Sequence, residues 1–449
     1  MVILESLSED AIHASLKDEL SYIEDERTRE RDFMLDFYEG INIDHYVGDY
    51  FSRETLKQVP IMQGNITKRV ASLVAMTYMR SPRLRVNDRY KELVDMSNLQ
   101  AQRRLVERLT FLLGTMAFRS YWDENVGKIK YQTLSHFTPL FLAGDNRDEP
   151  VGVMYPIEYQ GNARVETPVH AVWTKDTPDT QGMHYLVDQH GDKISVNDQD
   201  RNPYGVLPIT FCHRYPPIRD FYSGSGAMDV VTCDLATSVA MHELQLCTRY
   251  GAMGIKYLTN IDDPSRVEIG VDKLLYLPQD SDLRVTSPGG SLVEIIDSIR
   301  FFVESTLNNN HIRAKYARSD SGNAPSAASL SILEMENMNN RTAMTEDTWR
   351  PWEHRRYEVD RRILQVEANA DPGPDYSVDF LEPNYALTPE SEIALWSFYF
   401  DRGLATEESW YLYKNPDASP EEIAKFREQQ EAKQEDQTPQ NRLLNRLQS

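Results

Sequence analysis

The stretch AMDVVTCDLATSVAMHELQLCTRYG (227–251) predicts a helix with apolar residues on almost every side. Such a helix is buried among other helices. A second helix is predicted for SLVEIIDSIRFFVESTLNN (291–309), where Ser291 and Glu294 have capping-box spacing. Residues 253–290 hold the short apolar runs IKYLTN and KLLYLP joined by turn-forming residues, followed by DSDLRVTSPGG. The pattern predicts a small β-containing insert between two long helices.

The second helix leads into SDSGNAPSAASLSILEMENMNN (319–340), which begins with small and polar residues. Gly322 and Pro325 favour a bend without requiring a core. One interpretation is a polar surface linker. The other is a loop of small side chains past which something moves. A long helix is expected from about Ala327.

Three basic residues, Arg313, Lys315 and Arg318, stand at the end of the second helix. Cations at a helix C-terminus interact favourably with the helix dipole, which is a structural explanation for them. Transient contact with phosphate groups is the functional alternative. Both explanations remain open at the level of sequence.

Composition indicates a folded protein of about two to four compact units. Of its 449 residues 40% are apolar, and 24 Tyr and 6 Trp argue against disorder. No apolar run is long enough to cross a membrane, and no basic segment followed by an apolar run indicates a signal peptide. The three cysteines, which fit neither a disulfide framework nor a zinc site and are expected to be reduced, are Cys212, Cys233 and Cys247.

The charge balance is strongly acidic, with 70 acidic against 48 basic residues and a net charge of −22. Proteins that grip nucleic acid through its phosphates are basic, at least in patches. The balance therefore excludes a general DNA-binding protein. It is compatible with a surface that repels DNA, and equally with an acidic protein that has no nucleic-acid role.

The order of predicted elements indicates an α+β fold that is mainly helical. Helices are expected at 5–38, 65–79 and 88–119, the last broken near Gly114, with a short strand at 84–86. An antiparallel sheet is expected from the alternating segments 128–134, 170–174, 183–189 and 193–196. Pro351 should interrupt the long helix that ends near 371–375, and further helices should begin at Pro389 and Pro420.

Catalytic motifs are not found. SGSGAMD (223–229) has neither the third glycine of a dinucleotide site nor the Gly-Lys-Ser/Thr of a phosphate loop, so a glycine-rich helix start is the favoured interpretation. DNRDEP (145–150) lacks the glycine and distal Glu of a calcium loop, and no HExxH or GxSxG occurs. We therefore expect no catalytic residues, no metal and no cofactor.

Several stretches, taken in this order, resemble the portal proteins of tailed bacteriophages. They are LDFYEG (35–40), QGNITKRVASLVAMTYMRSPRL (63–84), HFTPLFLAGDNRDEPVGVMYPIEY (136–159), NPYGVLPITFCHRY (202–215), GSGAMDVVTCDLATSVAMHE (224–243) and SGNAPSAASLSILEMEN (321–337). The resemblance covers most of residues 30–370. It implies a wing (1–215 and 327–385), a first stem helix (216–252), a clip (253–290), a second stem helix (291–313), a tunnel loop (314–326) and a helical crown (386–449).

The resemblance also implies a structural protein rather than an enzyme. Portal proteins form rings, usually of about twelve copies, at one capsid vertex. Double-stranded DNA passes through the ring during packaging and ejection without sequence recognition. The implied partners are the terminase large subunit, a head–tail adaptor, and the major capsid and scaffolding proteins. The implied location is the virion, and the host cytoplasm during assembly, with no membrane involved.

Two groups of site residues follow from the resemblance. The expected tunnel-loop residues are Arg313, Lys315, Arg318, Ser319, Ser321, Gly322, Asn323, Pro325 and Ser326. The expected stem-interface residues are Leu246, Ile295, Ile299 and Phe302. The alternatives are a phage-encoded cytosolic enzyme with an unrecognised site, and another head–tail connector component.

Overall fold

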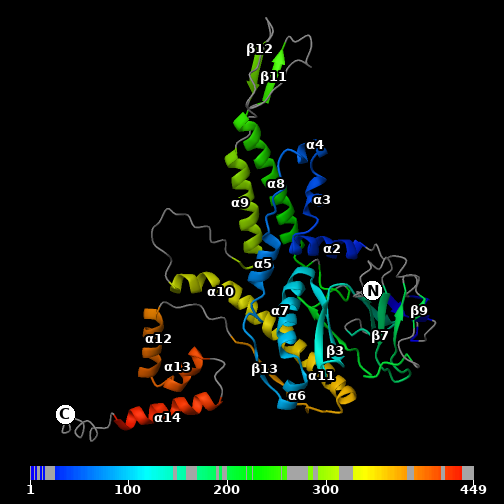
Figure 1. The fold of residues 1–449 in the computed structure, drawn as a ribbon, viewed down its shortest axis with the longest axis vertical. Helices are drawn as coiled ribbons and strands as arrows, with labels where there is room; N and C mark the ends of the chain where they lie inside the picture. Colours follow the sequence, from blue (N-terminus) through cyan, green and yellow to red (C-terminus); the bar gives the residue numbers. More distant parts are fainter. Residues whose placement is uncertain are drawn as a thin grey trace, which may run out of the picture. The chain divides into compact units, whose positions relative to one another are not determined.

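The fold is that of a computed structural model of the chain (Figure 1). The structure describes residues 2–4, 6–7, 11–12, 14–15, 26–144, 149–157, 169–188, 192–194, 200–218, 220–224, 226–253, 255–259, 282–286, 292–312, 327–381, 389–415 and 420–436. The chain divides into two compact units, one of residues 1–322 and 332–383 and the other of residues 323–331 and 384–449.

Runs of helices and runs of mainly antiparallel strands follow one another along the chain, which confirms the predicted α+β class. The helices before residue 384 are α2 (Glu26–Glu39), α3 (Ile43–Gly48), α4 (Arg53–Leu56), α5 (Ile66–Val74), α6 (Asp88–Leu93), α7 (Met96–Leu113), α8 (Met228–Met253), α9 (Leu292–Asn309), α10 (Ala327–Met344), the π-helix η2 (Thr345–Trp349) and α11 (Arg350–Glu367). The strands are β1 (Val2–Leu4), β2 (Arg83–Arg85), β3 (Thr115–Asp123), β4 (Lys128–Leu134), β5 (Thr138–Leu142), β6 (Gly152–Ile157), β7 (Val169–Thr174), β8 (His184–Val187), β9 (Lys193–Ile194), β10 (Ile209–His213), β11 (Ile255–Thr259), β12 (Asp282–Thr286) and β13 (Ser377–Asp379).

The larger unit contains a six-stranded sheet of order β1-β5-β6-β7-β8-β9 and a three-stranded sheet of order β10-β3-β4. Their strand pairs are antiparallel, as predicted, except at one edge. There β1 pairs parallel to β5, with Val2 opposite Leu140. The exception was not predicted because a three-residue strand carries too little alternation to be recognised.

The break predicted near Gly114 is confirmed, but the helix predicted to continue as far as 119 is wrong. Helix α7 ends at Leu113, and Gly114 takes a positive φ of 79°. Residues from Thr115 onward form β3, which pairs with β10 on one side and β4 on the other. A glycine with positive φ ends a helix at little cost, and the two neighbouring strands then satisfy the backbone of the following segment. The helix expected at 5–38 begins too early, since Ser6 and Leu7 are not helical, whereas its described residues at 11–12, 14–15 and 26–38 are helical.

The predicted interruption of the long helix at Pro351 is confirmed. The five residues of η2 form a π-helical turn between α10 and α11, and Pro351 lies in the first turn of α11. Proline has no N–H for the preceding turn, so the helix widens ahead of it. The new helix starts where the missing donor is not needed.

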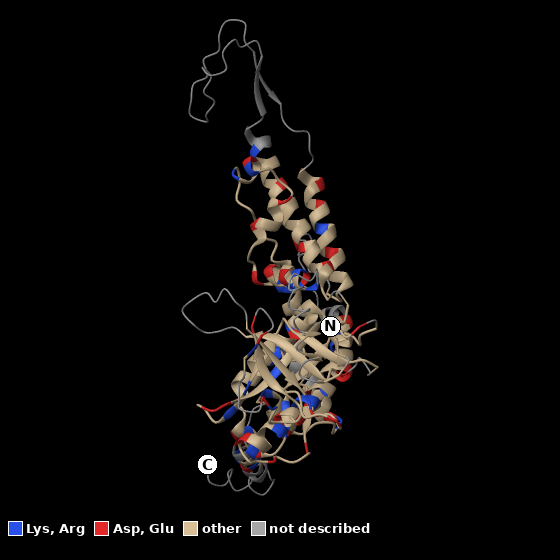
Figure 2. Ribbon diagram, turned by 90° about the vertical axis from the view of Figure 1, so that its right-hand side faces the viewer, with Lys and Arg blue, Asp and Glu red and all other residues tan. Residues whose placement is uncertain are grey.

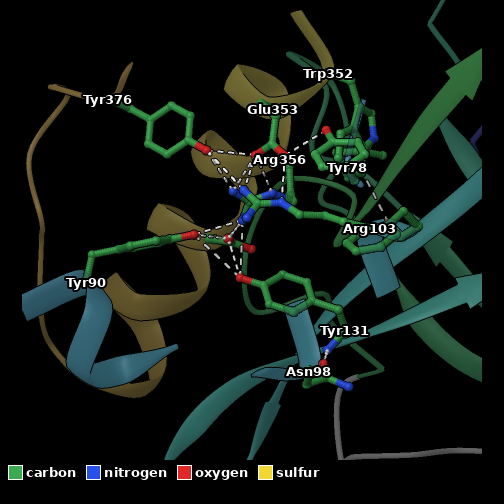
Figure 3. A network of polar contacts seen from close by, with 12 residues as sticks. Tyr78, Tyr90, Asn98, Arg103, Tyr131, Trp352, Glu353, Arg356 and Tyr376 are labelled. Atoms are coloured by element: carbon green, nitrogen blue, oxygen red, sulfur yellow. Dashed lines mark hydrogen bonds and ion pairs between the residues drawn. The ribbon is translucent and has the colours of Figure 1, made fainter. Parts of the chain in front are cut away.

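Helix α11 carries a buried polar network into the larger unit (Figure 3). Glu353 accepts two hydrogen bonds from Arg103 of α7, at 2.7 and 2.6 Å, and two from Arg356, at 2.9 and 3.3 Å. Arg356 also forms an ion pair with Asp360. The hydroxyl groups that complete the network come from Tyr78, Tyr90, Tyr131 and Tyr376. The network joins α11 to segments that are distant in sequence.

The smaller unit contains α12 (Pro389–Asp401), α13 (Glu407–Lys414) and α14 (Pro420–Asp436), which confirms the predicted helix starts at Pro389 and Pro420. Aromatic contacts hold the three helices together. Trp396 lies 5.1 Å from Tyr413, and Tyr411 stacks on Phe426 at 4.2 Å. None of the described helices has the length and apolar character that a membrane crossing requires.

Candidate functional site

The most distinctive feature of the larger unit is the antiparallel pair of helices α8 and α9 (Figure 1). The described parts of the segment that connects them form a two-stranded antiparallel sheet, in which Ile255 lies opposite Thr286 and Thr259 opposite Asp282. The predicted insert therefore contains β structure. IKYLTN forms its first strand as expected, but the second is DLRVT, and KLLYLP lies outside the described residues.

Polar contacts hold the base of the pair together. Asn310, which follows α9, donates from Nδ2 to Asp229 Oδ2 of α8 at 3.0 Å. Its Oδ1 accepts from Arg214 at 3.3 Å. Asn310 is buried, so these contacts satisfy an amide that burial would otherwise destabilise. No local pattern signals this pair, because its members are 81 residues apart.

The glycine-rich stretch before α8 has a packing role. Gly226 has a positive φ of 60°, and a Cβ atom there would lie 2.1 Å from the carbonyl oxygen of Leu112. The next residue, Ala227, donates its N–H to that same carbonyl at 2.8 Å. Only glycine allows α7 and the start of α8 to approach so closely. The geometry agrees with a glycine-rich helix start rather than a nucleotide site.

Helix α8 also packs against α2, α3 and α5. Asp234 of α8 accepts hydrogen bonds from the backbone N–H and the hydroxyl of Thr67, at 2.9 and 2.8 Å. It thereby caps the start of α5 from another helix. Burial raises the pKa of Asp234, although the hydrogen bonds from Thr67 oppose this. Further along α8, the ring of His242 lies 4.6 Å from that of Phe51.

Helix α9 leaves much of its apolar surface exposed. Its half-buried and buried positions recur every three or four residues, and they define the side that packs on α8. They are Ile295, Ile299, Val303, Thr306 and Leu307. Phe301 and Val293 project from other sides and are 66% and 65% exposed. Leu292, Ile296 and Phe302 are also exposed. In a single chain these side chains face water.

The expected stem-interface residues all lie on this pair. Phe302 is exposed, whereas Leu246, Ile295 and Ile299 are half-buried in the single chain. Phe301 and Val293 were not among the residues expected from the sequence. Apolar residues spaced three or four apart indicate the side of a helix that packs within its own chain, and these two residues lie outside that pattern. Their exposure is visible only in the folded chain.

The helix pair is sparsely charged and acidic (Figure 2). Helix α8 carries Asp229, Asp234 and Glu243 against the single base Arg249. Helix α9 carries Glu294, Asp297 and Glu304 against the single base Arg300. Each helix therefore has an excess of negative charge and offers few cations to a phosphate backbone.

The residues of the expected tunnel loop lie outside the part of the chain that the structure describes. They are Arg313, Lys315, Arg318, Ser319, Ser321, Gly322, Asn323, Pro325 and Ser326. The structure describes the two ends of this segment, Ile312 after α9 and Ala327 at the start of α10. Among the described residues, no three His, Cys, Asp or Glu side chains converge as metal ligands.

No family model and no curated protein matches the chain. Among solved structures, it is similar to a chain of the virion of a native gene transfer agent particle, with 12% identity and a TM-score of 0.38 over 80% of this chain and 93% of that chain. It is also similar to a chain of the neck of an empty gene transfer agent particle computed with C6 symmetry, with 11% identity and a TM-score of 0.39 over 81% of this chain and 93% of that chain. At these TM-scores neither similarity carries an inference about this chain.

Proposed function

We propose that this chain is a portal protein of the tailed-phage type, whose copies form a ring around a channel for double-stranded DNA. The observation that supports this most directly is the long helix pair α8–α9 with apolar residues left exposed on α9. The resemblance of the sequence to portal proteins over most of residues 30–370 points the same way.

Exposed apolar residues on a helix favour contact with another protein surface. Phe301 and Val293 do not lie on the side of α9 that packs on α8. A partner can therefore cover them without displacing α8. In a ring, each copy offers one surface to the copy before it and another to the copy after it. Helix α8, which also packs against α3 and α5, would then contribute its remaining surface to a neighbour.

The charge of the helix pair suits passage of DNA rather than its capture. Tight phosphate contacts would slow movement along the channel, and an acidic wall offers few of them. Under this proposal, Arg313, Lys315 and Arg318 would lie beside or within the small-residue segment 314–326, at the narrowest point of the channel. There they would contact the DNA phosphates only briefly. The end of the helix pair that carries β11 and β12 would serve as the docking platform for the terminase motor and the head–tail adaptor.

The direct test is the assembly state of the purified protein. Negative-stain images should show rings with a central hole, and light scattering should give a mass of many copies. The protein should not hydrolyse ATP, since its sequence has no phosphate-cradling loop with its lysine. A compact monomer with ATPase activity that co-purifies through several columns would instead favour the enzyme alternative.

A further inference from the structure

A cavity of about 700 Å³ lies beside the start of α2, next to the segment that leads into α8. Its lining residues are Arg27, Glu30, Arg31, Met34, Leu113, Tyr215, Pro216, Ile218, Asp220, Tyr222, Ser223 and Gly224. The volume is in the range of sites that hold small organic molecules. The lining is largely apolar and aromatic, with two guanidinium groups from adjacent turns of α2.

Arg31 is an unusual residue in this cavity because it is buried and has no counter-ion among the described residues. Its side chain is 5% exposed, and Nη2 donates a hydrogen bond to the carbonyl oxygen of Thr115 at 2.6 Å. The Nε–H, which is itself fully buried, has no acceptor in the part of the chain that the structure describes. The guanidinium lies 5.2 Å from the ring of Phe137 and 5.6 Å from that of Tyr222. Ring contacts of this kind stabilise a cation only in part.

The carboxylates near Arg31 are engaged elsewhere or lie in solvent. Asp220 pairs with Arg27 at 3.1 Å and accepts the backbone N–H of Tyr222 at 2.8 Å. Asp32 bonds His136 at 2.9 Å, and Glu30 is exposed. Within the described parts of the chain, no carboxylate forms an ion pair with Arg31. Burial lowers the pKa of Arg31 to about 10, so the guanidinium is still charged at neutral pH.

A buried, charged and incompletely bonded guanidinium is costly unless an anion completes it. We propose that the cavity binds a ligand that carries an anionic group, a carboxylate or a phosphate, on an apolar body. The anionic group pairs with the charge of the Arg31 guanidinium, which lines the cavity, and the body lies against Met34, Leu113 and Tyr215. Water in the cavity would leave the charge of the guanidinium without a counter-ion. The site is independent of ring assembly and of DNA passage.

The probes are benzoate and phenyl phosphate, with benzyl alcohol as the neutral analogue and inorganic phosphate as the anion without a body. Isothermal titration of the full chain should show binding of at least one aromatic anion. Benzyl alcohol and inorganic phosphate should each bind at least about tenfold more weakly, because each lacks one half of the recognised group. Comparison of benzoate with phenyl phosphate decides which anion the site prefers.

The variant Arg31→Met should bind the preferred anion at least about tenfold more weakly. Arg89→Met, which removes an exposed cation from α6, should bind it as the wild type does. Tyr215→Ala, at a partly exposed wall of the cavity, should weaken binding without unfolding the protein, and it keeps the test valid if Arg31→Met does not fold. The proposal would be overturned if the folded variants bound the anion as tightly as the wild type, or if benzyl alcohol bound as tightly as the aromatic anions. It would also be overturned if neither aromatic anion bound at millimolar concentration.

Discussion

Arg103 and Glu353 are 250 residues apart in the sequence, and their side chains form two parallel hydrogen bonds of 2.7 and 2.6 Å. Both side chains are buried, and the contact joins α7 to α11 (Figure 3). Burial by itself would raise the pKa of Glu353, but the charges of Arg103 and Arg356 hold that pKa far below its ordinary value. The carboxylate is therefore ionised at neutral pH.

Removing one partner of this pair should strongly destabilise the larger unit. We expect Glu353→Gln to lower the free energy of unfolding by about 3–5 kcal/mol, because Arg103 then loses its buried counter-charge and Arg356 keeps only Asp360. Glu92→Gln, at an exposed ion pair with Arg89, should change it by less than about 0.5 kcal/mol. Urea denaturation of both variants measures the difference. Similar values for the two would show that the buried network contributes little.

The two glycines before α8 provide a matched pair of substitutions. Gly226→Ala should lower the free energy of unfolding by roughly 2 kcal/mol or more, because φ is positive and the new Cβ would meet the carbonyl of Leu112. Gly224→Ala should have a small effect, since a Cβ there meets no atom within 4 Å. Thermal unfolding of both variants tests the close approach of α7 and α8. Equal melting temperatures would contradict it.

His184 should make stability depend on pH. Its ring stacks on Trp173 at 3.5 Å, and burial, with Arg119 nearby, lowers its pKa from 6.5 to about 4, although Asp200 opposes the shift. Between those pH values the unfolded chain binds a proton that the folded chain does not, so stability falls as the pH falls through this window. The expected loss is on the order of 1–3 kcal/mol, given partial exposure of the ring.

His184→Phe keeps the stacking and removes the titration, so it should flatten the dependence measured by urea denaturation between pH 6.5 and 4. Burial also lowers the pKa of His170, which should leave a residual slope in the variant. If stability depended on pH as steeply in the variant as in the wild type, titrating groups other than His184 would cause the dependence.

The exposed face of α9 is the most specific test of ring assembly. Phe301→Asp should convert rings to smaller species in size-exclusion chromatography with light scattering, because it places an unpaired charge in an apolar interface. Since Phe301 is exposed in the single chain, the monomer should stay folded. Charges at Leu246 or Ile299 should also disrupt rings, but these residues are half-buried within the chain, so folding must be checked separately.

Val366→Asp is the matched control, since it changes an exposed apolar residue on α11, outside the helix pair. Its assembly state should equal that of the wild type. Rings that persist in the Phe301, Leu246 and Ile299 variants would remove the α8–α9 pair from the interface between copies.

The role of the small-residue segment 314–326 can be tested by introducing large side chains. Under the proposed function, Ser321→Trp combined with Asn323→Trp should block DNA packaging while ring assembly and melting temperature stay unchanged, because many copies of the loop crowd one axis. Packaging rates of particles that contain the variant measure this. A normal rate would mean that the segment is a surface linker.

The sequence alone determined the features that depend on neighbouring residues. The helix pair at 227–251 and 291–309, strand β4 at 128–134, and the helix starts at Pro389 and Pro420 were predicted because periodicity, capping and proline act within a few residues. The same local reasoning extended the helix at 88–119 too far, because the end of α7 and the start of β3 depend on pairing with β10.

Only the tertiary structure decided which side chains meet. The buried pair Arg103–Glu353, the cap that Asp234 provides for α5, and the hydrogen bond from Arg31 to the carbonyl of Thr115 join segments far apart along the chain. Exposure of Phe301 likewise depends on which side of α9 is covered by α8. Local patterns arise from the backbone and its nearest side chains, whereas charge pairing and burial depend on distances that exist only once the whole chain has packed.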